Sequence, residues 1–434
     1  MRRIYLSIGI LFCFFSTDGQ PVSLKPDSIA IYFKDAELST SQSTRLWDMN
    51  FYGPVMLVNP ATREVYTNYP DKAGALKKQG DIFTGLLPAG INIANYVVEW
   101  NGLRWAMIMT NLVPARKEDR VNLFAHELFH RVQQELGFGL ITPDNSHLDK
   151  KNGRIFLRLE LEALKRAVLV HKRKSVHRHL TNAFLFRKHR QQFFPGSGMA
   201  ENWLELNEGI TEYTGLIIDG RTRDEAVMKL VRKIEGIQAG NMSFVRNFAY
   251  ATTPVHGYLL RKNKTYWNRG INSETDLTGF FVNQFRIRLP ALIPGEILRI
   301  ASEYNGDSIV SQENLREESM TALVKEYTEK LVTHPHVEIR CYSLKFTANT
   351  GNQLAAENHG TIYQSFFSGA DDWGTLLAEK GGVLVVAGKK RINISMPVTV
   401  DGNTVKGETW ILKLNDGYTI EKHTATGNFI VVKK

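Results

Sequence analysis

The stretch AHELFHRVQQELGFG, residues 125–139, places two histidines and a glutamate in the order H-E-x-x-H. The residues before it resemble a strand that ends near Pro114, and the pattern then changes to helical spacing. On a helix, His126 and His130 are one turn apart and lie on the same face, with Glu127 beside them. The stretch therefore predicts a helix, directly after a strand, that gathers three polar side chains.

These side chains are the types that a catalytic zinc ion needs. Two histidines supply two ligands, the glutamate between them supplies a base, and a third protein ligand leaves the fourth position for water. The best candidate for the third ligand is in ELNEGITEYTG, residues 205–215, where Glu208 and Glu212 are again one helical turn apart. Glu208 would complete a His-His-Glu set. Glu212 would then accept a hydrogen bond from a ligating imidazole, unless it is an ordinary carboxylate on the helix surface.

The pairing of HELFH with the downstream NEGITEY resembles the gluzincin zinc metallopeptidases. LNEGITEY in particular is similar to the W-L-N-E-G-F-A-E-Y stretch in the catalytic domain of aminopeptidase N-like enzymes. The resemblance covers about residues 95–265 and rests on short motifs. It implies one Zn²⁺ ion held by His126, His130 and Glu208, and it implies Glu127 as the general base.

The same family uses a tyrosine, further along the chain, to stabilise the oxyanion in a context like Y-x-x-G-A. Here FAYATTPVHGYLL, residues 248–260, offers Tyr250, with Thr253 where the glycine would be. Tyr258 is the alternative, and a packed aromatic without a catalytic role is another. A phenol at this place lowers the barrier because it donates a hydrogen bond to the charge that develops in the transition state.

The sequence departs from the aminopeptidase N-like pattern in three places. Arg131 follows the second histidine, where an uncharged residue is usual. The gap from His130 to Glu208 is far longer, so an inserted helical segment is expected between them. The family's G-x-M-E-N motif grips the amino terminus of the substrate and precedes the zinc helix, whereas GMAEN at 198–202 follows it here. Endopeptidase, aminopeptidase and carboxypeptidase action therefore all stay open.

The first residues, MRRIYLSIGILFCFFSTDGQ, are typical of a secretory signal peptide. A basic start at Arg2 and Arg3 precedes an apolar run from Ile4 to Phe15, and cleavage is expected near Gly19. The alternative is an uncleaved anchor, although the run is shorter than the roughly 20 residues of a spanning helix. No later stretch is long and apolar enough to span a bilayer, so the mature chain is expected to be secreted or periplasmic.

Composition restricts the ligands and the partners. Without the signal peptide only Cys341 remains, so His and carboxylate side chains must hold any metal. The net charge is +10, and much of the excess lies in residues 165–190, which we interpret as a solvated helical face. No nucleic-acid motif accompanies this segment, so the expected partner is a peptide or protein substrate. In the same region, Arg158, Glu160 and Glu162 either stabilise their helix or line the cleft.

The chain of 434 residues is long enough for two or three domains. We expect an α+β fold, with a zincin-like catalytic domain and a C-terminal all-β domain. A tight hairpin turn is expected at Asn101 and Gly102, and helices at about 154–190, 202–219 and 223–237. The expected division is a signal peptide at 1–19, an N-terminal β-rich part of the catalytic unit at 20–115, a helical zinc metallopeptidase domain at 116–335 and the β domain at 338–434.

The sequence thus predicts an exported zinc-dependent peptidase, in which Glu127 deprotonates a water and returns the proton to the leaving amine. A second hypothesis is a catalytically inactive peptidase-like binding protein at the cell surface or in the periplasm. Retention of Glu127 argues against it, because metal ligation alone does not require that base. A third hypothesis, binding of an anionic polymer by residues 165–190, predicts strongly salt-dependent association.

Overall fold

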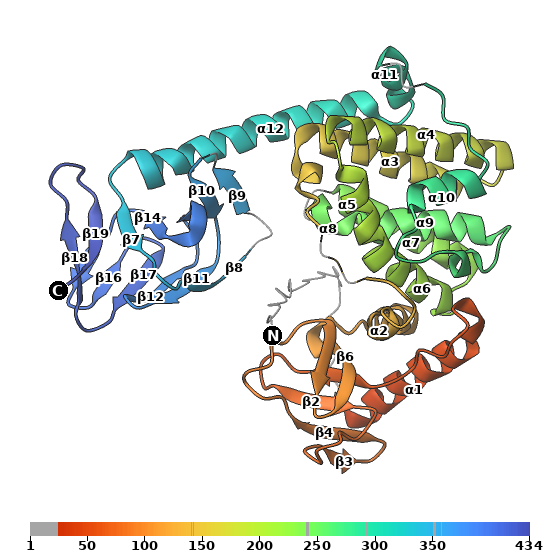
Figure 1. The fold of residues 1–434 in the computed structure, drawn as a ribbon, viewed down its shortest axis with the longest axis horizontal. Coiled ribbons are helices and arrows are strands. Elements are labelled where there is room, and N and C mark those ends of the chain that lie inside the picture. The colour runs from red at the N-terminus through yellow and green to blue at the C-terminus, as the bar shows by residue number, and fades with distance from the viewer. Residues whose placement is uncertain are drawn as a thin grey trace. The chain divides into compact units, whose positions relative to one another are not determined.

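The computed structural model divides into two compact units, one up to Val310 and one from Ser311 to Lys434. The architecture is mixed α and β, with a helical part in the first unit and an all-β region at the C-terminal end (Figure 1). The expected signal peptide at 1–19 lies outside the described residues. The structure describes residues 25–139, 141, 143–239, 243–291, 294–349, 353–356 and 358–434.

The first unit contains a six-stranded sheet with the strand order β3-β4-β2-β1-β6-β5. Strands β1 and β6 are parallel, and the other neighbouring pairs are antiparallel. Strand β5 therefore forms one edge. The strands are β1 (Val55–Val58), β2 (Glu64–Thr67), β3 (Lys77–Gln79), β4 (Ile82–Leu86), β5 (Tyr96–Trp100) and β6 (Leu103–Met109).

The two faces of this sheet pack against different parts of the unit. Strand alternation sends Val55 and Leu57 into the large core that also contains apolar residues of α1 (Pro26–Gln42) and α2 (Lys117–Val132). Met56 and Val58, which point the other way, join a smaller core with residues of the neighbouring strands and loops. Helix α2 follows β6 after a short link, so the strand and the helix that the sequence predicted are consecutive.

Two features of the N-terminal part test the sequence interpretation. The predicted hairpin is confirmed, because Trp100 pairs with Leu103 across Asn101 (φ 48°) and Gly102 (φ 79°). The expectation of a β-rich N-terminal part at 20–115 did not include α1. Its sequence does carry helical signals, since a proline lies at its start and buried Ile29, Phe33 and Ala36 follow helical spacing.

Helices form the rest of the first unit, and those predicted at about 154–190, 202–219 and 223–237 are confirmed. A single π-helical turn, Glu205–Gly209, joins α5 to α6 without a break in the helix. The remaining helices of this unit are α3 (Lys151–Leu169), α4 (Arg173–Phe193), α5 (Ser197–Leu204), α6 (Ile210–Ile218), α7 (Arg223–Gln238), α8 (Phe244–Asn247), α9 (Ala249–Arg261), α10 (Leu277–Gln284) and α11 (Pro294–Ser302). Helix α12 (Gly306–Thr328) begins in the first unit, and most of its residues belong to the second. Among the described residues, none of these helices has the length and apolar character to cross a bilayer.

The second unit contains two sheets around an apolar core that includes Phe367, Trp373, Ile392 and Leu412. Their strand orders are β18-β19-β7-β14-β13-β10-β9 and β15-β16-β17-β12-β11-β8. The strands are β7 (Val337–Arg340), β8 (Lys345–Ala348), β9 (Gln353–Ala356), β10 (Gly360–Tyr363), β11 (Phe367–Asp371), β12 (Gly374–Ala378), β13 (Val383–Val386), β14 (Arg391–Ile394), β15 (Thr399–Asp401), β16 (Thr404–Lys406), β17 (Trp410–Leu414), β18 (Tyr418–Lys422) and β19 (Phe429–Lys433).

Candidate metal centre

Three side chains that the sequence singled out meet at one point in the first unit. The Nε2 atoms of His126 and His130, both on α2, are 3.1 Å apart. Each of them is 3.4 Å from Oε2 of Glu208, which lies in the π-helical turn. His126 and Glu208 are buried, and the His130 side chain is 13% exposed. Residues 78 positions apart in sequence therefore form one compact donor set.

The spacing of these atoms fits a zinc ion. With bonds of about 2.0–2.2 Å, neighbouring ligand atoms in a tetrahedral zinc site are about 3.4 Å apart. The three observed separations, 3.1, 3.4 and 3.4 Å, are close to that value. The group is also the one set of His, Cys, Asp and Glu residues in the described part of the chain that could hold a metal ion.

Gln133 determines which nitrogen of His130 carries the proton. Its Nε2 donates to the carbonyl oxygen of Asn207 at 2.7 Å and to that of Leu206 at 3.3 Å. The amide oxygen of Gln133 must therefore face Nδ1 of His130, which is 2.7 Å away. Because that oxygen only accepts, Nδ1 donates and Nε2 keeps its lone pair for a metal ion.

Glu212 favours the same tautomer in His126, with the proton on Nδ1. Its Oε2 is 3.4 Å from Nδ1 of His126, and both side chains are buried. This distance is too long for a well-formed hydrogen bond, but a carboxylate there favours the tautomer with the proton on Nδ1. In that tautomer both Nε2 atoms face each other and the Glu208 carboxylate. A positive charge between them, from a proton on an imidazole or from a metal ion, stabilises such an arrangement.

The local electrostatics favour that positive charge. Burial would lower the pKa of His126, but the carboxylates of Glu208 and Glu212 outweigh it and raise this pKa to about 10. Burial would raise the pKa of Glu208, yet the two imidazoles hold it well below its usual range. The pKa of Glu212 is lowered to about 2, because His126, Lys229 and Lys233 outweigh its burial. Both carboxylates are therefore ionised at neutral pH.

Glu127 lies beside the two histidines and is buried. Its pKa is raised by burial, an effect that the charges of His126 and His130 partly offset. Its Oε2 has no hydrogen-bond partner within the described residues. A buried carboxylate with a raised pKa and an unused oxygen is suited to accept and return a proton.

The structure brings Tyr250 to the site and leaves Tyr258 away from it. The hydroxyl of Tyr250 donates to Oε2 of Glu208 at 2.6 Å, and its ring stacks on His126 with centroids 5.6 Å apart. The hydroxyl of Tyr258 instead donates to the carbonyl of Arg223 at 3.3 Å. Of the two candidates, only Tyr250 contacts the donor set.

A glycine allows α9, which carries Tyr250, to approach the π-helical turn closely. A Cβ atom on Gly209 would lie 2.3 Å from Oγ1 of Thr253 and 3.0 Å from the carbonyl oxygen of Ala249. The φ of Gly209 is −67°, so space and not backbone conformation excludes a side chain here. The glycine of the NEG motif thus permits the contact between Tyr250 and Glu208.

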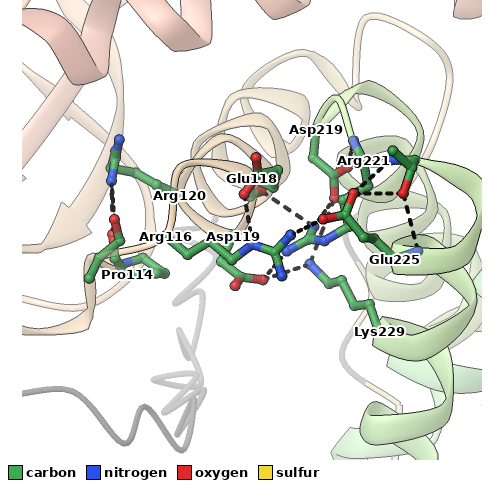
Figure 2. A network of polar contacts seen from close by, with 11 residues as sticks. Pro114, Arg116, Glu118, Asp119, Arg120, Asp219, Arg221, Glu225 and Lys229 are labelled. Atoms are coloured by element: carbon green, nitrogen blue, oxygen red, sulfur yellow. Dashed lines mark hydrogen bonds and ion pairs between the residues drawn. The ribbon is translucent and has the colours of Figure 1, made fainter.

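A network of charges fixes the start of α2 against α6 and α7. Figure 2 shows Asp119 of α2 and Asp219, at the end of α6, pairing with the guanidinium of Arg221. Arg116, directly before α2, lies 2.6 Å from Glu225 in the first turn of α7. These ion pairs connect α2, which carries the two histidines, to the end of α6 and the start of α7. They therefore help to fix α2 relative to the helix that follows Glu208.

The basic segment 165–190 is only partly a solvated face. Arg187 and Arg190 of α4 are fully buried, which corrects the prediction for these two residues. Each lies 2.7 Å from a carboxylate oxygen of Glu160, and Nε of Arg190 is 2.8 Å from Oε1 of Glu201. These charges are not available to a polyanion. Glu201 belongs to GMAEN, and its buried carboxylate is occupied by Arg190, so it is not available to grip a substrate.

The other undecided polar residues have structural contacts. Glu162 pairs with Lys165 of the same helix at 2.9 Å. The unusual Arg131 donates to the carbonyl oxygens of Phe51 and Tyr52 at 3.1 and 3.2 Å. It therefore ties the end of α2 to the segment before β1 and takes no part in the donor set.

The comparison with known proteins identifies no relative. No family model, no curated protein and no solved structure matches this chain. Function must therefore be inferred from the arrangement of these residues.

Proposed function

We propose that this protein is an exported zinc-dependent peptidase with a zincin-like catalytic unit. The observation that carries the proposal is the convergence of His126, His130 and Glu208, with both Nε2 atoms 3.4 Å from one oxygen of an ionised carboxylate. A buried set of this kind is costly without a cation between its atoms. Imidazole and carboxylate donors in a three-ligand set are those of catalytic zinc sites.

The surrounding fold supports a peptide as the substrate. Strand β5 is an edge of the first sheet, and it neighbours β6, the strand that leads into α2. An extended peptide pairs with such an edge through main-chain hydrogen bonds, which bind it without regard to most side chains. This arrangement favours a peptide or protein over a small ligand.

The reaction assigns a distinct task to each remaining residue. A zinc ion in this set would supply Lewis acidity, which lowers the pKa of a bound water and polarises a carbonyl. Oε2 of Glu127 accepts the proton of the attacking water and later delivers it to the leaving amine. The Tyr250 phenol has one O–H, which donates to Glu208 in this structure and would turn to donate to the developing oxyanion. Gln133 and Glu212 hold the imidazoles in the tautomer that leaves Nε2 free.

Replacement of the base tests this proposal. We expect the purified protein, loaded with zinc, to hydrolyse members of a quenched fluorescent peptide library. Glu127→Gln should bind zinc as before but lose about 10²-fold to 10⁴-fold in rate, because only the proton acceptor is removed. Glu135→Gln, an exposed change on the turn after α2, is the matched control and should keep full activity.

Two outcomes would contradict the proposal. Equal hydrolysis by Glu127→Gln and the unmutated protein would exclude this mechanism. Bound zinc without hydrolysis of any peptide, in either form, would instead indicate a peptidase-like binding protein.

A further inference from the structure

The π-helical turn begins with a glutamate that lies outside the donor set. Glu205 is fully buried and precedes Glu208 by three residues. Arg187 of α4 binds it in a two-pronged manner, with Nη1 2.8 Å from Oε2 and Nη2 2.8 Å from Oε1. Bidentate pairs of this kind hold both planar groups in one orientation. The first residue of the turn is therefore fixed against α4.

The same carboxylate also contacts the helix of Tyr250. The hydroxyl of Thr252, on α9, donates to Oε1 of Glu205, and Thr252 is fully buried. Thr252 follows Tyr250 by only two residues, so a shift of α9 at this contact moves both side chains. One buried carboxylate thus joins α4, the π-helical turn and α9.

The position of this contact explains why it matters for the donor set. Tyr250 reaches Glu208 because α9 packs closely against the turn. This close packing requires a glycine at position 209, since a Cβ atom there would overlap Thr253 of α9. Two hydrogen bonds then connect α9 to the turn, from Thr252 to Glu205 and from Tyr250 to Glu208. π-helical turns inside α-helices occur frequently at functional sites. Here the turn carries one glutamate for each of the two bonds.

We propose that Thr252 and Glu205 are positioning residues for the metal ligand Glu208. Their hydrogen bond holds α9 in register on the π-helical turn, so that Tyr250 donates to Oε2 of Glu208 and directs this oxygen at the two histidines. The guanidinium of Arg187 lies 2.8 Å from Oε1 of Glu205 and holds this carboxylate in place in the core. The inference rests on the proposed function, because Glu208 is a ligand only in that proposal.

Two buried threonines that contact the same charge cluster provide a matched test. Thr252→Val removes the hydroxyl between Glu205 and α9. Thr278→Val removes a hydroxyl on α10 that accepts from Nη1 of Arg187 at 2.9 Å and, within the described residues, makes no hydrogen bond to the donor set. The readouts are zinc affinity, by competition with a chromogenic chelator, and the visible spectrum of the cobalt-substituted protein. Neither readout depends on turnover.

We expect zinc affinity about tenfold lower or weaker still in Thr252→Val, with a changed cobalt spectrum, because supporting residues of metal ligands have effects of this size. Thr278→Val should bind zinc like the unmutated protein. Thr252→Ser, which keeps the hydroxyl, should also bind normally, and this variant serves if Thr252→Val does not fold.

The inference would be overturned by equal zinc affinity and equal cobalt spectra in Thr252→Val and Thr278→Val. Weak zinc binding by Thr252→Ser would overturn it as well. In both cases the unmutated protein still binds zinc, so the proposed function is untouched. Failure of the unmutated protein to bind zinc is a separate result, and it would remove the proposed function together with the inference.

Discussion

The amide of Gln133 connects His130, the second histidine of α2, to the backbone that carries Glu208. Its oxygen accepts from Nδ1 of His130, and its nitrogen donates to the carbonyl of Asn207, both at 2.7 Å. The buried side chain of Gln133 therefore sets the tautomer of the candidate ligand His130. It also positions Asn207, the residue before the candidate ligand Glu208. This relationship depends on the hydrogen-bonding pattern of the amide and not on charge.

Removal of this amide should weaken the metal site. We expect Gln133→Leu to lower zinc affinity about 10-fold to 100-fold, because His130 loses the partner that fixes its proton on Nδ1. The adjacent Gln134 is exposed and provides the control, so Gln134→Leu should bind zinc normally. Zinc affinity measured with a competing chelator decides the question. Equal affinities in the two variants would contradict the role of Gln133.

Tyr250 and Tyr258 lie on the same helix, and the proposed mechanism assigns a catalytic role to Tyr250 alone. We expect Tyr250→Phe to lower kcat for peptide hydrolysis about 10²-fold to 10³-fold with little change in KM, because the hydrogen bond forms mainly in the transition state. Tyr258→Phe should leave both constants unchanged. Steady-state kinetics on one peptide substrate provides the measurement. Loss of kcat in Tyr258→Phe alone would reverse the assignment.

A methyl group at Gly209 should disturb the contact between α9 and the π-helical turn. We expect Gly209→Ala to reduce the free energy of unfolding by about 1–3 kcal/mol, since the new Cβ overlaps Thr253. Gly236 lies in α7 with nothing within 4 Å of a Cβ, so Gly236→Ala should instead stabilise by about 1 kcal/mol. Urea denaturation measures both changes. Equal free energies of unfolding in the two variants would contradict the claim that a side chain at position 209 overlaps α9.

The buried carboxylate of Glu201 makes stability depend on pH. Burial would raise its pKa, but Arg190 and His147 outweigh burial and hold this pKa well below the usual 4.5. Its stabilising contribution is therefore complete above about pH 4.5 and is lost as the pH falls below that value. We expect the difference in free energy of unfolding between the unmutated protein and Glu201→Gln to shrink between pH 6 and pH 3. A difference that grows on acidification would contradict this sign.

The sequence was sufficient to bring the candidate ligands together. His126 and His130 follow from helical periodicity, because residues four apart share a face whatever else the chain does. Glu208 was found from a second motif 78 residues later, and the structure places its carboxylate 3.4 Å from both imidazoles. The sequence favoured Tyr250 over Tyr258, and the structure places only the Tyr250 hydroxyl in contact with Glu208.

Other parts could not be obtained from sequence patterns. Arg187 and Arg190 look like surface charges in the basic segment, because their carboxylate partners come from other helical segments, 11 to 30 residues away along the chain. Gln133 carries no charge and belongs to no motif, although its place one turn after His130 was a usable signal. Helix α1 was missed because it buries only a narrow apolar stripe.

The metal content of the purified protein tests the central claim most directly. Elemental analysis should find about one zinc ion per chain, as three protein ligands of this type predict. The content should fall sharply in Glu208→Ala and stay unchanged in Glu303→Ala, a change of a glutamate that pairs with Arg178 on the surface. Absence of zinc from the unmutated protein, after reloading at neutral pH, would contradict the account and leave the H-E-x-x-H stretch as a coincidence of helix composition.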